Sequence, residues 1–585
     1  MEEFEDVTEV TFDDESLSET FDELSVSQQG QDHGIGMLSA SEGLKIDEEP
    51  DDTCLRAYIT VENRQDVRIG TYLLVPYPDE ERLFARITGL EYAQEFRSDD
   101  ANEIHARRAM RSEEIDEHDY KFIATLEPVA VLYEQHEELT RRMTDRVPMP
   151  ETIVERATDT EEIKTGLKIP DTGVFLGHLA VGGQKVKTAA EPPTIDYRLD
   201  DSDEGGDPLV FRHSLIAGGT GSGKTHAAKN ILRQYFERRY EMPDGRSPQL
   251  ALVQFDPQDE YAQLHDDNDT LTTETARQYD QESIAHGGHE DTKAFVPVVG
   301  SASYGGGHHR AEQVPFTISF SMVQSNPWLI ARGGLNENQY PALIDLIKRF
   351  FSEQPDGSYR AFREFLSDDL RERLSDSGRI HEATFNAVRR RTGGFGPIFD
   401  QDAPPITDLV EQFVRPGGVS VVPTYHLNSA RAKETVVLAL ANLLISQKLS
   451  NDADYERIAH TPLVIGMDEA HNFLTDADTP QAQKVIQSFT EAAKQGRKER
   501  LGLFLITQDP QDIADPVFKQ INTTIVLNLG DEDAIKAVNI PRSLESKVPY
   551  MEKGQMVVYS PDNSEPVEII GLSNCVTRHG RESTE

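Results

Sequence analysis

Short runs in which apolar and polar residues alternate characterise the first part of the chain. Turn residues such as Gly70 and Gly89 separate these runs. Alternation with a period of two predicts half-buried strands, and several short strands at this spacing predict a small β-barrel over residues 53–185. A charged, helix-compatible insertion over residues 97–120 interrupts it. The predicted strands are Leu55–Val61, Val67–Val75, Leu83–Tyr92, Phe122–Tyr133 and Thr172–Leu179.

Beyond residue 181 the pattern changes to compact apolar runs separated by segments with helical periodicity. Continuous apolar runs are typical of strands covered on both faces, and their alternation with helices predicts an α/β fold with a mostly parallel sheet. Residues 186–334 and 416–540 would form the two parts of this core. Its predicted strands are Ser214–Ala217, Leu250–Phe255, Val419–Val422, Leu463–Met467, Leu503–Thr507 and Thr524–Leu529.

Two further segments complete the predicted organisation. Residues 335–415 read as an inserted helical subdomain, with helices expected over Tyr340–Phe351 and Ser358–Arg373. The last segment, 541–585, holds strand-like runs at Met556–Ser560 and Val567–Leu572. We expect it to pack on the core or on a neighbouring subunit.

Charge changes this picture mainly at the N-terminus. Residues 1–52 contain 18 Asp and Glu residues against the single Lys45, so we expect an acidic, disordered leader. The whole chain carries a net charge of −45, and only 19 of its 58 basic residues are Lys. Acidic excess normally argues against a nucleic-acid partner. Because the acids are spread along the chain, we favour adaptation to concentrated salt, and a specific basic partner is the alternative.

The sequence does not indicate a membrane protein or a disulfide-stabilised protein. The longest strongly apolar stretch, Val436–Ile445, is too short to span a bilayer. The acidic N-terminus does not resemble a signal peptide. Cys54 and Cys575 lie at opposite ends of the chain, away from any metal-ligand spacing. We therefore expect a cytoplasmic protein without membrane segments.

One glycine-rich segment matches the Walker A pattern. It comprises Gly218, Gly219, Thr220, Gly221, Ser222, Gly223, Lys224 and Thr225, after an apolar strand and before a helical pattern over His226–Tyr240. In that context the backbone N–H groups cradle phosphate oxygens at a helix N-terminus. Lys224 would reach the β- and γ-phosphates of ATP, and the hydroxyl of Thr225 would ligate Mg²⁺.

Acidic residues end two of the predicted strands. Asp468 and Glu469 follow Leu463–Met467, where Asp468 would hold Mg²⁺ and Glu469 would act as the general base on water. Asp256 and Glu260 follow the strand that comes one helix after the Walker A segment. We expect them beside the phosphates, where they orient water or metal; a plain polar turn is the alternative.

Gln508 and Arg497 are the remaining candidate catalytic residues. Gln508 stands at the tip of the strand next to Asp468 and would sense the γ-phosphate. Arg497, or Arg500 in the same basic cluster, could reach a neighbouring subunit's ATP as an arginine finger, whereas a solvated helix end is the plainer interpretation. Other basic positions, Arg389–Arg391 and Arg431, are candidate contacts for DNA phosphates or a neighbouring subunit.

Taken in order, these segments resemble the HerA family of the HerA–FtsK group of P-loop ATPases. The resemblance runs through Met467–Phe473 (MDEAHNF), Gly496–Lys498 (GRK) and Thr507–Gln508 (TQ) and covers about residues 55–572. The family's DPHGEY motif reads DPQDEY here, with Gln258 and Asp259 in the middle. Together with the acidic composition noted above, this resemblance indicates a member of haloarchaeal type.

The resemblance implies a RecA-like ATPase core with an N-terminal barrel of the HAS type. It further implies a homohexameric ring whose ATP sites lie between subunits, translocation on double-stranded DNA, and DNA end resection and repair with a NurA-like nuclease. Two alternatives stay open: a peripheral motor ATPase of a secretion or DNA-transfer system, and an ATPase scaffold of an anti-phage defence complex.

Overall fold

A computed structural model describes residues 34–39, 43–47, 53–94, 120–202, 207–331, 334–475, 479–538, 540–563 and 565–580. Within these residues the chain divides into two compact units, 1–166 and 167–585, which are described separately. The charged insertion expected over 97–120 and most of the expected leader lie outside the described residues, except that Tyr120 begins a strand.

The first unit is a closed antiparallel β-barrel. Strand order is β2-β1-β7-β3-β4-β5, and β2 pairs with β5 to close the ring, while β6 extends β5. Alternate residues of strands such as β2 point into an apolar core, which is the period-two pattern expected of a barrel. Its elements are β1 (Gly34–Leu38), β2 (Arg56–Ile59), β3 (Tyr72–Pro76), β4 (Arg82–Gln94), β5 (Tyr120–Gln135), β6 (Glu138–Arg142) and β7 (Ile153–Arg156).

Two expected boundaries of the barrel are wrong. The leader was expected to extend to residue 52, yet Gly34–Leu38 forms β1 between β2 and β7, with Ile35 and Leu38 buried in the barrel core. Thr172–Leu179 was expected in the barrel, yet Val174–Val181 forms β8 of the second unit. Seven of its eight residues are buried, and a strand covered on both faces belongs in a layered sheet.

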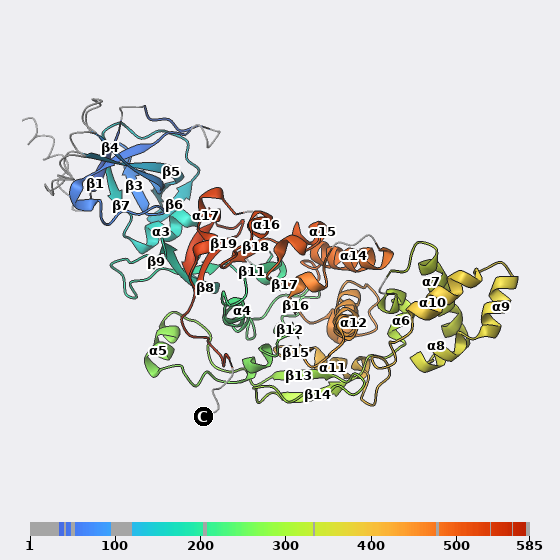
Figure 1. Cartoon of the computed structure of the whole chain (residues 1–585). Helices are drawn as coiled ribbons and strands as arrows, with labels where there is room; N and C mark the ends of the chain where they lie inside the picture. The colour runs from blue at the N-terminus through green and yellow to red at the C-terminus, as the bar shows by residue number, and fades with distance from the viewer. Residues whose placement is uncertain are drawn as a thin grey trace, which may run out of the picture. The chain divides into compact units, whose positions relative to one another are not determined.

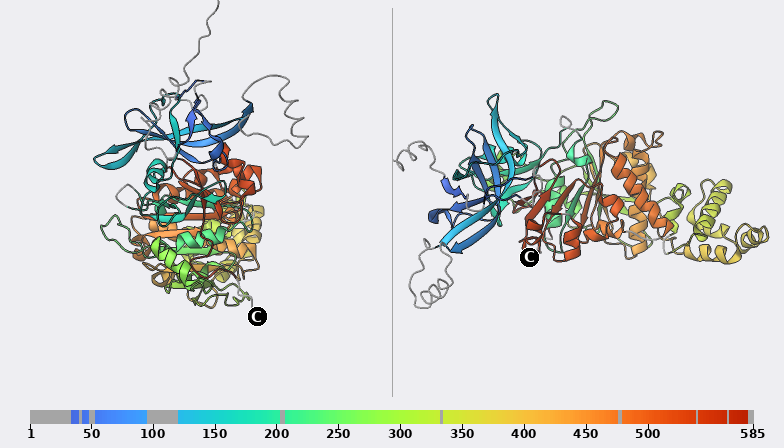
Figure 2. Two further views of the ribbon diagram at one scale, coloured as in Figure 1. Left: turned by 90° about the vertical axis from the view of Figure 1, so that its left-hand side faces the viewer. Right: turned by 90° about the horizontal axis from the view of Figure 1, so that it is seen from above.

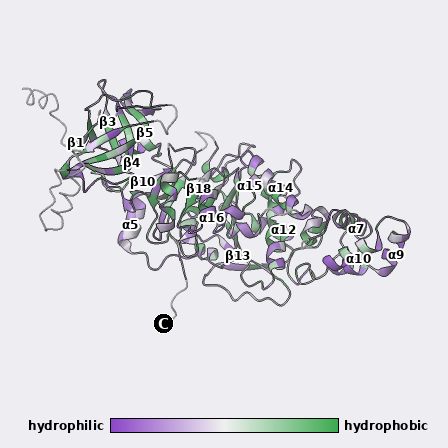
Figure 3. Ribbon diagram, turned by 45° about the horizontal axis from the view of Figure 1, so that its top comes forward, coloured by the Kyte–Doolittle hydropathy of each residue, from purple (hydrophilic) through white to green (hydrophobic). Residues whose placement is uncertain are grey.

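The second unit is built on one large mixed sheet (Figure 1). Neighbouring strands β18-β11-β17-β16-β12-β15-β13-β14 are parallel, and β19, β20, β8 and β10 continue the sheet in antiparallel pairs. In Figure 3 the hydrophobic colouring gathers in the strands, while surface helices such as α9 are largely hydrophilic. The sheet confirms the predicted α/β class.

Strand bounds in this sheet follow the apolar runs closely. The strands are β8 (Val174–Val181), β9 (Gln184–Lys185), β10 (Asp196–Leu199), β11 (Ser214–Ala217), β12 (Ala251–Asp256), β13 (Thr292–Pro297), β14 (Glu312–Phe316), β15 (Val419–Pro423), β16 (Leu463–Met467), β17 (Leu501–Thr507), β18 (Thr523–Val526), β19 (Gln555–Tyr559) and β20 (Val567–Ile570). Of these, β9, β10, β13 and β14 were not predicted from the sequence.

Helices cover this sheet and form the insertion. Helix α4 packs on β11 and β8, and α14 packs on β17 and on α12. The helices are α3 (Thr160–Leu167), α4 (Lys224–Leu232), α5 (Thr273–Gln281), α6 (Met322–Ser325), α7 (Gln339–Glu353), α8 (Tyr359–Phe365), α9 (Asp368–Asp376), α10 (Glu382–Arg391), α11 (Val410–Phe413), α12 (Ala430–Lys448), α13 (Glu456–Ala459), α14 (Pro480–Gln495), α15 (Asp515–Phe518), α16 (Glu532–Ala537) and α17 (Arg542–Glu545).

Helices α7–α10 gather beyond α6 and α12, as Figures 1 and 2 both show. The single helix expected over Ser358–Arg373 is two helices, because Ser367 caps a new helix by accepting from the N–H of Leu370. The helix expected over His226–Tyr240 is shorter, since α4 ends at Leu232 and tighter turns follow. A buried core continuous with the sheet runs into this insertion.

Candidate functional site

The Walker A segment joins β11 to α4 in a tight loop. Gly221 and Gly223 have φ values of 79° and 104°, the left-handed region that favours glycine. A Cβ at Gly218 would lie 2.6 Å from Ser222 Oγ, so only glycine fits there. The ammonium of Lys224 donates to the carbonyls of Gly218 (2.7 Å) and Gly219 (3.1 Å). The loop is therefore a backbone cradle with one cation fixed at its opening.

Strand order brings the other predicted residues to the same edge. Because β11, β17 and β16 are adjacent and parallel, their carboxyl ends lie side by side. Gln508 follows β17, and its side-chain oxygen accepts a hydrogen bond from the Thr220 hydroxyl at 2.9 Å. Asp468 and Glu469 follow β16. The loop, the glutamine and the acidic pair thus come from three neighbouring strands.

Asp468 and Glu469 differ sharply in their surroundings. Burial, together with the neighbouring Asp256 and Glu469, raises the pKa of Asp468 to about 8, and one of its oxygens accepts from the Glu469 N–H. Glu469 adopts a left-handed backbone (φ 52°), which is costly for a non-glycine residue, and its Oε2 is buried without a hydrogen-bond partner. A strained carboxylate with an unused oxygen can accept a proton from water.

The donor set fits Mg²⁺ held through phosphate oxygens. Mg²⁺ keeps several waters and is usually bound by one or two carboxylates together with substrate phosphates. Thr225 and Asp468 supply a hydroxyl and a carboxylate, and Lys224 lies close enough to Asp468 to lower its pKa. In the described part of the chain, no group of three or more His, Cys, Asp or Glu could hold a metal ion by itself.

Asp256 ends β12 and Glu260 follows it, and Asp256 lies close enough to Asp468 to raise its pKa. β12 pairs with β16 and β15, so it is separated from the P-loop strand β11 by two strands. Asp256 is fully buried, and its carboxylate accepts from the N–H groups of Gln258 (3.1 Å) and Tyr261 (2.7 Å). Burial raises its pKa to about 7. Asp256 therefore organises the turn, and the expected role of Asp256 and Glu260 in orienting water or metal stays a prediction.

The same turn positions Tyr261 and Glu260 toward the site. Burial, together with the nearby Asp468, Asp256 and Glu260, raises the pKa of the Tyr261 hydroxyl well above its usual value, and this hydroxyl also lies close to Thr225. Glu260 is half-buried beside it. Tyr261 was not a candidate from sequence, although it closes the DPQDEY motif.

His471 is a second residue that sequence reasoning quoted only as part of a motif. Its Nδ1 lies 3.0 Å from Thr507 Oγ1 and 3.5 Å from Glu469 Oε2, and its Nε2 lies 3.6 Å from Asp509. His471 thus links the acidic pair after β16 to the end of β17, next to Gln508. An imidazole two residues after a catalytic carboxylate is the signal that could have identified it.

The basic turn that contains Arg497 and Arg500 lies at the opposite edge of the sheet. Arg500 accepts at its carbonyl from the N–H of Leu463, which begins β16, and Leu501 begins β17. β17 has 7 residues, which at about 3.3 Å per residue places this turn about 20 Å from the P-loop. Neither arginine can reach the nucleotide loop of its own subunit.

Arg497 and Arg500 differ in what holds them. Arg500 donates to the carbonyl of Glu241 (2.7 Å), lies 3.8 Å from Asp207 and stacks over Phe211. Among the described residues, the side chain of Arg497 makes no hydrogen bond or ion pair, and it lies near the buried His213. Arg500 is therefore committed to its own subunit, whereas Arg497 remains available.

The other basic positions are partly engaged within the chain. Arg389 pairs with Asp368, and Arg431 donates to the carbonyl of Gly393 and stacks over Phe395. Arg389, Arg390 and Arg391 form the last turn of α10.

Three comparisons place these features among known proteins. Residues 205–444, less than half of the chain, match the family model described as "Helicase HerA, central domain". The DNA double-strand break repair helicase HerA of Pyrococcus furiosus is 21% identical over 412 residues, covering 64% of this chain and 67% of that protein. Both matches support a relationship to HerA-type ATPases. No relative in these matches establishes what this chain acts on.

Two solved structures match most of this chain at low similarity. VirB4 of Thermoanaerobacter pseudethanolicus is 14% identical, covers 69% of this chain and 97% of that chain, and has a TM-score of 0.44. The plasmid coupling protein TrwB, solved with the ATP analogue ADPNP, is 13% identical, covers 70% of this chain and 98% of that chain, and also scores 0.44. At these TM-scores the likeness carries no functional conclusion.

None of the helices in the described ranges combines the length and the apolar character needed to cross a membrane.

Proposed function

We propose that this chain is a HerA-like ATPase that couples ATP hydrolysis to movement of double-stranded DNA through a homohexameric ring. One observation carries the ATPase part: adjacent parallel strands β11, β17 and β16 bring Lys224, Gln508 and the Asp468–Glu469 pair to one edge. The match of residues 205–444 to the HerA central domain supports the DNA-motor part.

Each residue at this edge has a defined task in the proposal. The N–H groups of the P-loop and Lys224 bind the phosphates of ATP. Thr225 and Asp468 hold Mg²⁺, which supplies charge neutralisation at the β- and γ-phosphates. Glu469 takes the proton from the attacking water. Gln508, bonded to Thr220 of the P-loop, reports whether the γ-phosphate is present.

The ring explains the position of the basic turn. Arg497 lies about 20 Å from its own P-loop, and in this proposal it serves a neighbouring subunit's ATP. In a heterologous ring each subunit would present the basic turn to the P-loop of the next subunit. The guanidinium of Arg497 would then stabilise charge on the transferred phosphoryl group. Closing and opening of these interfaces would move the DNA.

We further propose, by analogy with the HerA family, that the motor acts in the cytoplasm in DNA end resection and repair with a NurA-like nuclease. The acidic composition fits a haloarchaeal source.

The test measures ATPase activity in high KCl with and without linear duplex DNA. Native protein is expected to be stimulated by DNA, and Lys224→Ala to be inactive with or without it. Lys519→Ala is the matched control, since Lys519, which directly follows α15, is exposed and its side chain pairs only with Asp515 among the described residues. Absence of DNA stimulation at every salt concentration would contradict the translocase proposal while leaving the ATPase intact.

A further inference from the structure

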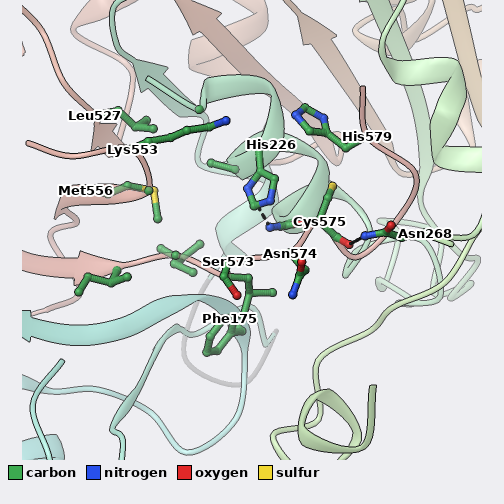
Figure 4. A pocket seen from close by; sticks show the side chains of 18 of the residues that line it. Phe175, His226, Asn268, Leu527, Lys553, Met556, Ser573, Asn574, Cys575 and His579 are labelled. Carbon is green, nitrogen blue, oxygen red and sulfur yellow. Dashed lines mark hydrogen bonds between the residues drawn. The ribbon is translucent and has the colours of Figure 1, made fainter. Parts of the chain in front are cut away.

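A pocket of about 500 Å³ opens beside the P-loop (Figure 4). Gly223 of the P-loop is part of its wall, and the first turns of α4 contribute His226 and Asn230. Lys553 comes from the segment before β19, with its side chain close to Gly223. The opposite wall is the chain's C-terminal segment, residues 573–580, which contributes Ser573, Asn574, Cys575 and His579.

The C-terminal segment is held in place through its backbone. Lys229, fully buried on α4, donates to the carbonyl of Arg578 at 2.6 Å, and Asn230 accepts from the N–H of Val576 at 2.9 Å. Further bonds run from Tyr279 to Asn574 O (3.1 Å), Asn268 to Cys575 O (2.7 Å), Gly287 N to Val576 O (2.8 Å), Gln263 to Gly580 O (3.0 Å) and Arg578 N to Asp266 O (3.0 Å). Such dense anchoring fixes this wall of the pocket.

Because these hydrogen bonds mostly use the backbone of the segment, several of its side chains are free to line the pocket. Among the described residues, His579 and the amide of Asn574 make no side-chain hydrogen bond. The rings of His226 and His579 lie edge to face, 5.3 Å apart, and burial lowers the pKa of each to about 4. Two uncharged aromatic rings and a free amide, with apolar Phe175, Leu527 and Met556 around them, suit a heterocyclic base.

We infer that the nucleoside part of the triphosphate lies in this pocket, with its base against His226 and His579 and its edge within reach of the Asn574 amide. This rests on the proposed function and extends it, because the C-terminal segment becomes part of the nucleotide site. The P-loop binds phosphates, and Gly223 belongs to both the P-loop and the pocket wall. A bound nucleotide whose phosphates occupy the loop can therefore extend along α4 without leaving the protein surface.

Inorganic tripolyphosphate separates the two halves of the site, since it carries the phosphates without a nucleoside. The experiment uses the full chain and the variants His579→Ala and Asn574→Ala, and measures KM for ATP together with the inhibition constant of tripolyphosphate. His308→Ala is the control, because His308 is exposed and outside the pocket lining.

For His579→Ala we expect KM for ATP to rise about tenfold, as loss of one stacking contact predicts, with inhibition by tripolyphosphate unchanged. His308→Ala should behave like the native protein. An unchanged KM for ATP in both pocket variants would overturn the inference, as would equal weakening of ATP and tripolyphosphate, which indicates damage to the P-loop. Native protein that neither hydrolyses ATP nor binds tripolyphosphate would instead contradict the proposed function.

Discussion

Mixing two inactive variants tests whether the ATP site is shared between subunits. Lys224→Ala removes the cation of the P-loop, and Arg497→Ala removes the arginine about 20 Å away at the other edge of the sheet. If each site takes Lys224 from one subunit and Arg497 from its neighbour, both homogeneous variants are inactive for different reasons. A mixed ring can then contain complete sites.

The size of the effect follows from the geometry. Loss of an arginine finger costs about 10³- to 10⁵-fold in kcat, so Arg497→Ala alone should be near background. In a random equal mixture, about a quarter of the interfaces join an intact Lys224 to an intact Arg497, because each interface draws one residue from each partner. Recovery of up to about a quarter of native activity is expected, since each complete interface can hydrolyse ATP.

The two variants are mixed, their rings are dissociated into subunits, and the subunits are allowed to reassemble. Light scattering checks the ring size, and the assay then measures ATP hydrolysis in the presence of DNA. Arg500→Ala is the matched control from the same turn. Its side chain is bound to Glu241 and Asp207, so this variant should lose about 1–2 kcal/mol of stability but keep its activity below its Tm. Full activity of Arg497→Ala alone, or no recovery in mixed rings of native size, would refute the shared site.

Three further variants examine single residues. Glu469→Gln should lower kcat by about 10²- to 10⁴-fold while ATP still binds. Rapid-quench experiments measure the hydrolysis step and nucleotide-binding experiments measure the affinity for ATP. An unchanged kcat would show that Glu469 is not the general base. Phe320→Ala, at a fully buried ring packed among five other aromatic rings, should cost about 3–5 kcal/mol in chemical unfolding, and a loss below about 1 kcal/mol would contradict this packing. Burial lowers the pKa of Lys448 to about 7. Between pH 7 and about 10.4 the native state therefore binds fewer protons than the unfolded state, so the free energy of unfolding should rise with pH by on the order of a few kcal/mol. The Lys448→Met variant should lack this rise. If the free energy of unfolding changes with pH in the same way in the native protein and in Lys448→Met, the buried amine of Lys448 is not the cause of the rise.

Local features of the molecule were readable from sequence because they depend on neighbouring residues. The apolar run Ser214–Ala217 followed by glycines predicted β11 and the P-loop, because strand formation and left-handed turns depend on neighbouring residues. Leu463–Met467 likewise coincides with β16. The acidic pair after it was recognisable because it directly follows an apolar strand in a chain that also carries a Walker A segment.

Features that depend on which strands pair could not be read in this way. The strand that ends in Asp256 follows the P-loop helix in sequence, yet β17 and β16 lie between β11 and β12 in the sheet. Likewise Val174–Val181 joins the large sheet, and Gly34–Leu38 joins the barrel despite its acidic flanks. Strand order is chosen by long-range packing, where segments hundreds of residues apart compete for the same edge.

The sequence alone therefore determined the chemical groups of this protein: a phosphate loop around Lys224, an acidic pair at Asp468 and Glu469, and an alternating α/β core. Only the tertiary structure decided which groups meet. It placed Gln508 against Thr220, buried Asp256 as a support of its turn, moved Arg497 to the far edge, and brought His579 beside His226. The physical reason is that chemistry resides in single side chains, whereas proximity results from the packing of the whole sheet.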